Sequence, residues 1–170
     1  MQRADALIRQ PFAQRIQDTA DLTVFPRQVH GIAAVRGEAL RGADAVQADA
    51  IVSTTPGLGV GIVTADCVPI LVANADGSRV AAIHAGWRGL AAGVIEAGIE
   101  ALELSPGQLL AAVGPAARGC CYEVDDPVAE ALSVPYSDLL DDLLVPSRPG
   151  HYQLDLLGPR LFREPGAERP

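Results

Sequence analysis

Two apolar segments joined by an Asp-Gly pair constrain the fold of this chain more than any other feature. The segment VPILVAN (68–74) precedes Asp76-Gly77 and RVAAIHA (79–85) follows it. An Asp-Gly pair between two such runs is a strong signal for the turn of a β-hairpin. The sequence therefore predicts two adjacent antiparallel strands.

The register of this hairpin predicts which side chains meet at its open end. A two-residue turn and a four-residue loop both place Cys67 opposite Gly86. Side chains alternate between faces along a strand, so Cys67 and His84 emerge on one face as diagonal neighbours, with Cβ atoms about 7 Å apart or less. The pair could share a metal ion or a proton, or each residue could simply be buried.

The remaining segments predict a mixed α+β (α/β) fold, with mixed β-sheets and flanking helices in a layered sandwich. Apolar residues recur at helical spacing after Arg88, which favours a helix that begins near Leu90. The other predicted elements are a short helix within 1–20, strands in 21–31, 49–54, 57–65 and 108–115, a loop or bulged hairpin over 36–48, and a helix over 126–133.

Composition indicates one soluble globular domain over residues 1–170. Hydrophobic residues make up 49% of the chain and charged residues 20%. A net charge of −8 argues against nucleic acid as a partner. The three cysteines make no disulfide framework, and no signal peptide or membrane-spanning run occurs, so we expect a cytoplasmic protein without a membrane partner.

Five motifs resemble the YfiH/laccase-domain family, historically called multicopper polyphenol oxidases and associated with purine nucleoside phosphorylase activity. They cover a core of about residues 25–125, with a weaker match in YQLDLL (152–157). In order they are RQVHG (27–31), ADAIVS (48–53), TADCVPIL (64–71), AAIHAGWRGLAAGVIEA (81–97) and VGPAARGCCYEV (113–124).

The resemblance implies a YfiH-like fold and a metal site formed by His30, Cys67 and His84. Zinc is the expected ion and copper is possible. Three protein ligands would leave a fourth position open, as in a catalytic zinc site, and Cys67 and His84 are the candidate catalytic residues. The implied reactions are phosphorolysis of purine nucleosides, including methylthioadenosine, and hydrolytic deamination of adenosine.

Several neighbouring residues are candidates for supporting roles. Arg88, ahead of the predicted helix, is the candidate phosphate holder. Trp87 could stack on a base, although packing is the simpler interpretation. Asp66 could orient His30 or His84 from outside the ligand set, or cap the strand end. Four further residues match the family without a defined role: Cys120, Cys121, Tyr122 and Glu123. His151 has no motif partner and is expected at the surface.

Three other functions remain open from the sequence. Copper at the same three residues would give a polyphenol oxidase, although a full multicopper enzyme needs far more than the three histidines present. A metal-free cysteine hydrolase would use Cys67 as nucleophile and His84 as base. The chain could also be a binding domain without activity.

The chain is shorter than family members at both ends, and Pro159 and Pro165 stand where a helix would be expected. Without the family's C-terminal strand, the sheet should keep an exposed edge and the metal site an open side. We therefore expect the chain either to self-associate as a homo-oligomer, or to bind metal while it turns over nucleosides slowly.

Overall fold

A computed structural model describes residues 23–42 and 46–158. The short helix predicted within residues 1–20 lies outside the described residues, as do Pro159 and Pro165.

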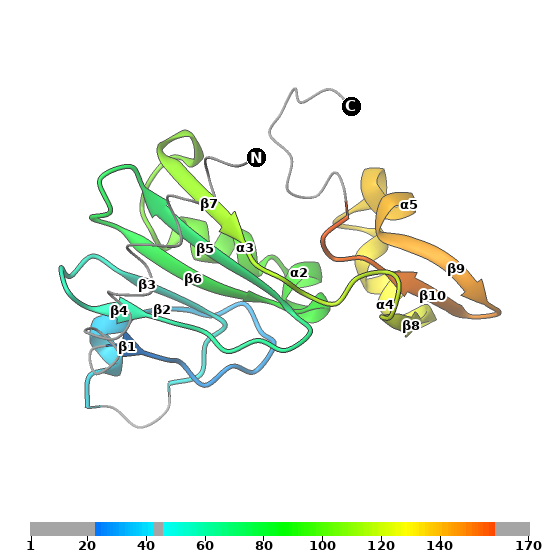
Figure 1. The fold of residues 1–170 in the computed structure, drawn as a ribbon, viewed down its shortest axis with the longest axis horizontal. Helices are drawn as coiled ribbons and strands as arrows, with labels where there is room; N and C mark the ends of the chain where they lie inside the picture. Colours follow the sequence, from blue (N-terminus) through cyan, green and yellow to red (C-terminus); the bar gives the residue numbers. More distant parts are fainter. Residues whose placement is uncertain (1–22, 43–45, 159–170) are drawn as a thin grey trace.

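The main layer is a five-stranded sheet in the order β2-β3-β6-β5-β7 (Figure 1). Its β2–β3 pair is parallel and the other pairs are antiparallel. All four residues of β3 are buried, and β6 is buried almost throughout, so this sheet forms the core. The strands are β2 (Ala34–Arg36), β3 (Ala50–Ser53), β5 (Val68–Asn74), β6 (Val80–Ala85) and β7 (Leu109–Val113).

The predicted hairpin is β5–β6, with the predicted register. Pro69 pairs with His84 and Val68 pairs with Ala85. Beyond the assigned strand ends, the backbone N–H of Asn74 donates to the Arg79 carbonyl at 3.1 Å and encloses a four-residue loop, 75–78. In this loop Gly77 has a φ of 70° that few other residues tolerate. The hairpin register predicted from the sequence is therefore confirmed.

The predicted helix after Arg88 is in fact two short helices, α2 (Trp87–Ala92) and α3 (Val94–Glu100). Gly93 separates them with a φ of 96°. The helix also begins at Trp87 rather than near Leu90, so the prediction was wrong on both points. The apolar period runs on across Gly93, which is why sequence spacing alone did not reveal the break.

Helix α3 lies against the middle of the sheet. A Cβ added at Gly98 would lie 2.6 Å from Ile83 Cδ1 and 3.3 Å from Ala50 Cβ. Glycine at this position therefore allows the helix to approach β6 closely, and α2 and α3 follow directly from the strand that carries His84.

A smaller sheet at the other end of the molecule has the order β8-β10-β9 (Figure 1). The Tyr136 hydroxyl beyond α4 donates a hydrogen bond of 3.2 Å to the Leu90 carbonyl in α2, linking the two parts. The helix predicted over 126–133 is confirmed. The elements are β8 (Glu123–Asp125), α4 (Asp126–Ser133), η4 (Ser137–Leu139), α5 (Leu140–Leu143), β9 (Leu144–Arg148) and β10 (His151–Leu154).

The N-terminal strand predictions were only partly right. In the described part of this segment, residues 23–31, the structure has strand at β1 (Thr23–Val24), which pairs in parallel with β4 (Gly59–Val60). The segment 36–48, predicted as a loop or bulged hairpin, contains a 3-10 helix, η2 (Gly37–Leu40), in its described part. The preceding β2 pairs in parallel with β3, a non-local arrangement that no turn signal announces.

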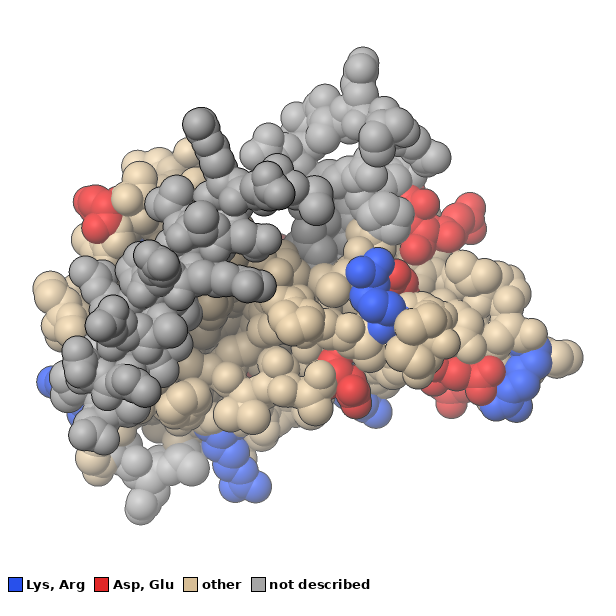
Figure 2. All heavy atoms as spheres, viewed as in Figure 1, with Lys and Arg blue, Asp and Glu red and all other residues tan. Residues whose placement is uncertain are grey.

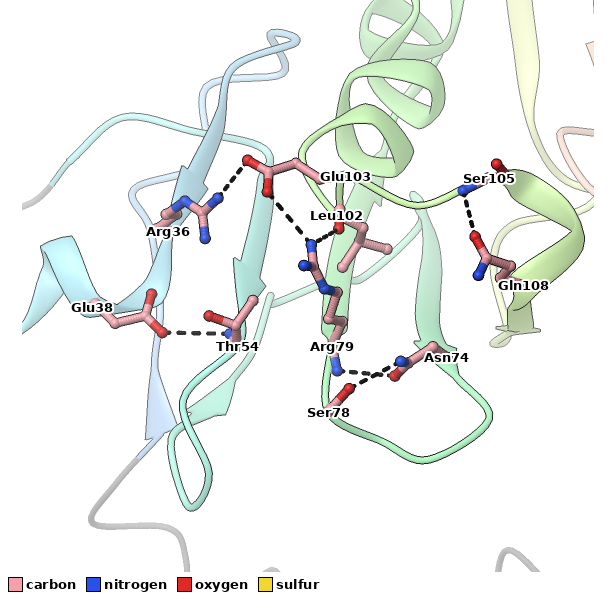
Figure 3. A network of polar contacts seen from close by, with 10 residues as sticks. All are labelled: Arg36, Glu38, Thr54, Asn74, Ser78, Arg79, Leu102, Glu103, Ser105 and Gln108. Carbon is pink, nitrogen blue, oxygen red and sulfur yellow. Dashed lines mark hydrogen bonds and ion pairs between the residues drawn. The ribbon is translucent and has the colours of Figure 1, made fainter.

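A network of polar contacts lies at the end of the sheet that carries the hairpin loop (Figure 3). The Arg79 guanidinium donates a hydrogen bond to the Leu102 carbonyl just beyond α3 and approaches Glu103, which in turn pairs with Arg36 at 2.7 Å. Because these groups are largely exposed, each ion pair contributes little free energy. The network lies at the opposite end of β6 from His84.

Strand β7 is an edge strand of the sheet in the described part of the chain, and its Leu110 is 66% exposed. Self-association through this edge stays a prediction. The capping turn before the strand is η3 (Pro106–Gln108), where Ser105 and Gln108 form a capping box (Figure 3).

On the face drawn in Figure 2, basic side chains stand apart from one another without a continuous stripe. In residues 23–42 and 46–158, no helix combines the length and hydrophobicity that a membrane crossing needs.

Candidate metal centre

Three side chains from distant parts of the sequence meet at the open end of the β5–β6 hairpin. The potential ligand atoms of His30, Cys67 and His84 all lie within 4.8 Å of one another. Burial increases across the group, from exposed His30 through half-buried Cys67 to buried His84. The group is therefore anchored in the core and reachable from solvent on the His30 side.

His30 is held in an unusual backbone conformation, with a φ of 59°. Such left-handed geometry is uncommon outside glycine and persists only where the surroundings enforce it. Here Asp49 accepts hydrogen bonds from the backbone N–H groups of Val29, His30 and Gly31, at 3.2, 2.9 and 2.7 Å. One carboxylate thus shapes the whole His30 loop.

Gln28 fixes the same loop to the segment that leads to Cys67. Its side-chain amide donates to the Val63 carbonyl and accepts from the Val63 N–H, both at 2.7 Å. In the Q-x-H-G motif, Gln28 therefore holds the loop in place and His30 is the candidate ligand.

Asp49 also orients His84. The Asp49 Oδ1 lies 2.8 Å from His84 Nδ1, and the backbone N–H of His84 donates to the Asp49 carbonyl at 2.7 Å. An ionised carboxylate can only accept, so Nδ1 carries the proton and Nε2 keeps its lone pair for the site. Carboxylate–histidine pairs of this kind set the tautomer of metal ligands.

The Asp49 side chain is fully buried, and burial acts to raise its pKa. The hydrogen bonds from His84 and the loop amides outweigh this effect, and the pKa of Asp49 is lowered. The carboxylate stays ionised because each oxygen accepts two hydrogen bonds.

Asp49 is the functional residue that the sequence reasoning missed. Asp66 was one candidate for orienting a histidine, but the carboxylate partner of His84 is Asp49. Asp66 itself is exposed, and its backbone carbonyl accepts from the Ala117 N–H. A signal was present, since Asp49 directly precedes the fully buried strand β3. An acidic side chain at such a position needs a specific partner.

The three residues fit a zinc-type ion in chemistry and spacing. One thiolate and two imidazoles are ligands that zinc prefers. Tetrahedral zinc with bonds of about 2.0–2.3 Å needs ligand atoms roughly 3.4–3.7 Å apart. Cys67 Sγ and His30 Nε2 are 3.9 Å apart, and the two histidine rings meet edge to face with centroids at 4.8 Å. Small side-chain movements would complete the coordination.

Gly86 keeps the space between two of these residues free. A Cβ added there would lie 3.0 Å from both Cys67 Sγ and His30 Cδ2. The backbone at Gly86 has a φ of −77° and a ψ of 165°, which any residue adopts. Glycine is therefore required for room rather than for conformation.

Gly86→Ala is expected to weaken zinc binding while the chain remains folded. The added methyl would push Cys67 and His30 apart, and we expect about a tenfold loss in affinity, similar to a disturbed outer-shell contact. Competition with a chromophoric chelator measures the affinity. Gly107→Ala is the control, because a Cβ there meets nothing within 4 Å. Unchanged affinity in Gly86→Ala would mean that this space does not matter.

The Cys67 thiol is neutral without a metal. Burial, followed by the charges of Asp66 and Asp49, raises its pKa. Metal binding must therefore displace the proton. Burial raises the pKa of the half-buried Tyr122, and the negative charge of Asp66 raises it further.

Arg88 is exposed in the first turn of α2, two residues beyond Gly86 at the candidate metal centre. Its guanidinium carbon lies 4.2 Å from the centroid of the Trp87 ring. Within the described residues Arg88 forms no ion pair with a carboxylate, so its charge is available to an anion. Trp87 is partly buried against the core and carries Arg88 on its ring, which favours packing over base stacking.

The remaining positions singled out in the sequence lie in the segment 120–123 and at the start of β10. The Tyr122 carbonyl accepts from the Leu154 N–H, whereas Glu123 pairs with Arg148 at 2.7 Å, away from the ligand group. Cys120 and Cys121 are exposed. His151 is partly exposed at the start of β10, with Nδ1 3.1 Å from the Pro149 carbonyl oxygen.

Together these features define a class of protein: an α+β fold with a candidate His-Cys-His metal centre beside an exposed arginine. A family model described as multi-copper polyphenol oxidoreductase laccase matches residues 6–161. The chain belongs to this family, which confirms the resemblance seen in the motifs.

Two curated relatives and one solved structure agree with this assignment. A purine nucleoside phosphorylase from Pseudomonas aeruginosa is 39% identical over 129 residues, covering 76% of this chain and 52% of its own length. The adenosine deaminase RL5, from an unknown prokaryotic organism, is 32% identical over 159 residues, covering 87% and 61%. A crystal structure of a Neisseria meningitidis protein superimposes with a TM-score of 0.77 at 32% identity, covering 85% and 60%.

The chain thus spans about half to three fifths of the length of these relatives. The match to the solved structure confirms the predicted α+β fold class.

Proposed function

We propose that this chain is a metal-dependent enzyme acting on purine nucleosides, as a nucleoside phosphorylase with adenosine deaminase and methylthioadenosine phosphorylase activity. The observation that carries the proposal is the meeting of His30, Cys67 and His84 within 4.8 Å, with the exposed Arg88 two residues beyond Gly86. The names of the two curated relatives support both reaction types.

The proposed metal ligands are His30, Cys67 and His84, with zinc as the preferred ion and copper as the second. When bound, such an ion supplies Lewis acidity and an activated water near neutral pH. Asp49 keeps His84 in the required tautomer and holds the His30 loop in place, so the protein contributes a preformed set of donors.

Arg88 is the proposed phosphate-binding residue. In phosphorolysis a phosphate oxygen bonds to the ribose C1′ while the bond from C1′ to the purine nitrogen breaks and the purine leaves. Arg88 can hold phosphate through two parallel N–H donors, and its position over Trp87 restricts the side chain before phosphate arrives. Deamination of adenosine uses water at C6 and needs no phosphate.

Arg88→Ala is expected to reduce phosphorolysis far more than deamination. Loss of a charge-assisted contact of about 1.5–3 kcal/mol corresponds to roughly a 10- to 100-fold lower kcat/KM for phosphorolysis. Adenosine turnover with and without phosphate, following hypoxanthine, adenine and inosine, measures both reactions in one sample. Arg36→Ala is the matched control, because Arg36 lies in the network at the far end of the sheet (Figure 3). Equal losses in both reactions would assign Arg88 to shared substrate binding or to folding.

A one-copper polyphenol oxidase is the second candidate, favoured by the name of the matched family. Copper(II) binds imidazole and thiolate more tightly than zinc in the usual order of affinities. Oxidation of a phenol by the copper-loaded chain, exceeding its nucleoside turnover, would favour this candidate.

The metal-free cysteine hydrolase is disfavoured by the site. Reactive cysteines have a lowered pKa, whereas burial and two carboxylates raise the pKa of Cys67. That alternative also leaves the costly conformation of His30 without a purpose.

A further inference from the structure

Cys120 and Cys121 form a pair of exposed thiols outside the metal centre. Their Sγ atoms are 3.2 Å apart, so both side chains point to the same side of the chain. Both cysteines are free. Neither belongs to the group formed by His30, Cys67 and His84.

The pair sits on a tight turn that Arg118 holds in place. The Cys121 N–H donates to the Arg118 carbonyl at 3.0 Å, and the Cys121 thiol lies 3.6 Å from the same oxygen. The Arg118 guanidinium binds both carboxylate oxygens of Asp155, at 2.9 and 3.0 Å. The turn therefore presents the two thiols together before any ligand arrives.

The spacing of the sulfur atoms suits a bridging atom better than a direct bond. A disulfide needs sulfur atoms about 2.05 Å apart and Cα atoms about 4.4–6.8 Å apart. Neighbouring Cα atoms across a trans peptide are only about 3.8 Å apart, so a disulfide here would be strained. Two sulfur bonds of about 2.3 Å, meeting near a right angle at one soft atom, place the sulfurs about 3.3 Å apart.

We propose that Cys120 and Cys121 form a chelating site for trivalent arsenicals. Soft thiolate ligands select soft, thiophilic centres, and trivalent arsenic is pyramidal with bond angles near a right angle. With an organoarsenic oxide, two S–As bonds form and the As–O bond breaks. The two thiol protons leave with the oxygen as water, and no change of oxidation state occurs.

The site differs from the metal centre in its selectivity. It offers two sulfurs and no imidazole, and it lies exposed on a turn rather than at the end of buried strands. Arsenical binding at Cys120 and Cys121 should therefore leave a zinc ion at the metal centre in place. The proposal does not depend on the proposed nucleoside activity.

Phenylarsine oxide added to the zinc-loaded 170-residue chain tests the site. Intact-mass spectrometry should find one phenylarsenic adduct per chain. The adduct should survive excess glutathione and be removed by 2,3-dimercaptopropanol, because only a dithiol competes with a chelate.

Cys120→Ser and Cys121→Ser should each lose the glutathione-resistant adduct, while Cys67→Ser should keep it. Circular dichroism confirms that the exposed substitutions leave the chain folded. An adduct that persists in Cys120→Ser, or one that glutathione removes from the unaltered chain, would overturn the proposal.

Discussion

Asp49→Asn is expected to lower zinc affinity about 10- to 100-fold, the usual effect of removing an outer-shell partner. The substitution keeps the shape of the side chain but should still weaken zinc binding, because both Asp49 oxygens act only as acceptors. Oδ1 accepts from the His30 N–H and His84 Nδ1, and Oδ2 accepts from the N–H groups of Gly31 and Val29. An amide NH₂ in either place would face two donors.

The same substitution should destabilise the fold. Each part-buried N–H left without an acceptor costs about 1–3 kcal/mol, so we expect a loss of roughly 2–5 kcal/mol in the free energy of unfolding. Urea denaturation measures the stability and chelator competition the affinity. Asp66→Asn is the control, since this exposed neighbour of Cys67 should change both quantities little. If Asp66→Asn lost zinc and Asp49→Asn did not, the assignment of Asp49 would be wrong.

Cys67→Ser is expected to have the largest effect on activity. A hydroxyl is a poor zinc ligand compared with a thiolate, and loss of a direct ligand should exceed the roughly 10- to 100-fold effect of an outer-shell change. Phosphorolysis and deamination should fall together, because both would use the same metal centre. Zinc content and adenosine turnover, measured on one preparation, give the two readouts.

Thr64→Ala is the matched control for Cys67→Ser, because Thr64 lies in the same segment and is not among the candidate ligands. It should retain zinc and both activities. A Cys67→Ser chain that keeps its zinc and loses all turnover would instead favour a cysteine nucleophile.

The part of the site that could be predicted from residues alone is the part formed by one hairpin. Asp76-Gly77 fixes the loop, the loop fixes the register, and the register brings Cys67 and His84 to one face. Each step depends on short-range turn chemistry and on the two-residue period of strands. The structure confirms this register directly.

His30 and Asp49 could not be found in the same way. His30 reaches the site through a left-handed backbone held by Asp49, nineteen positions away in sequence. Asp49 meets His84 only because β3 pairs with β6, a contact between distant segments. Local propensity carries no information about such pairing, and only the family resemblance indicated His30. The break at Gly93 was missed for a simpler reason, since the apolar residues keep helical spacing on both sides of it.

The central claim is that His30, Cys67 and His84 bind one metal ion together. X-ray absorption at the zinc edge, on the chain loaded with one equivalent of zinc, tests it most directly. The expected spectrum contains one sulfur at about 2.3 Å and nitrogen or oxygen neighbours at about 2.0–2.1 Å, including two imidazoles. A spectrum without a sulfur neighbour, or with two or more sulfurs, would contradict the claim.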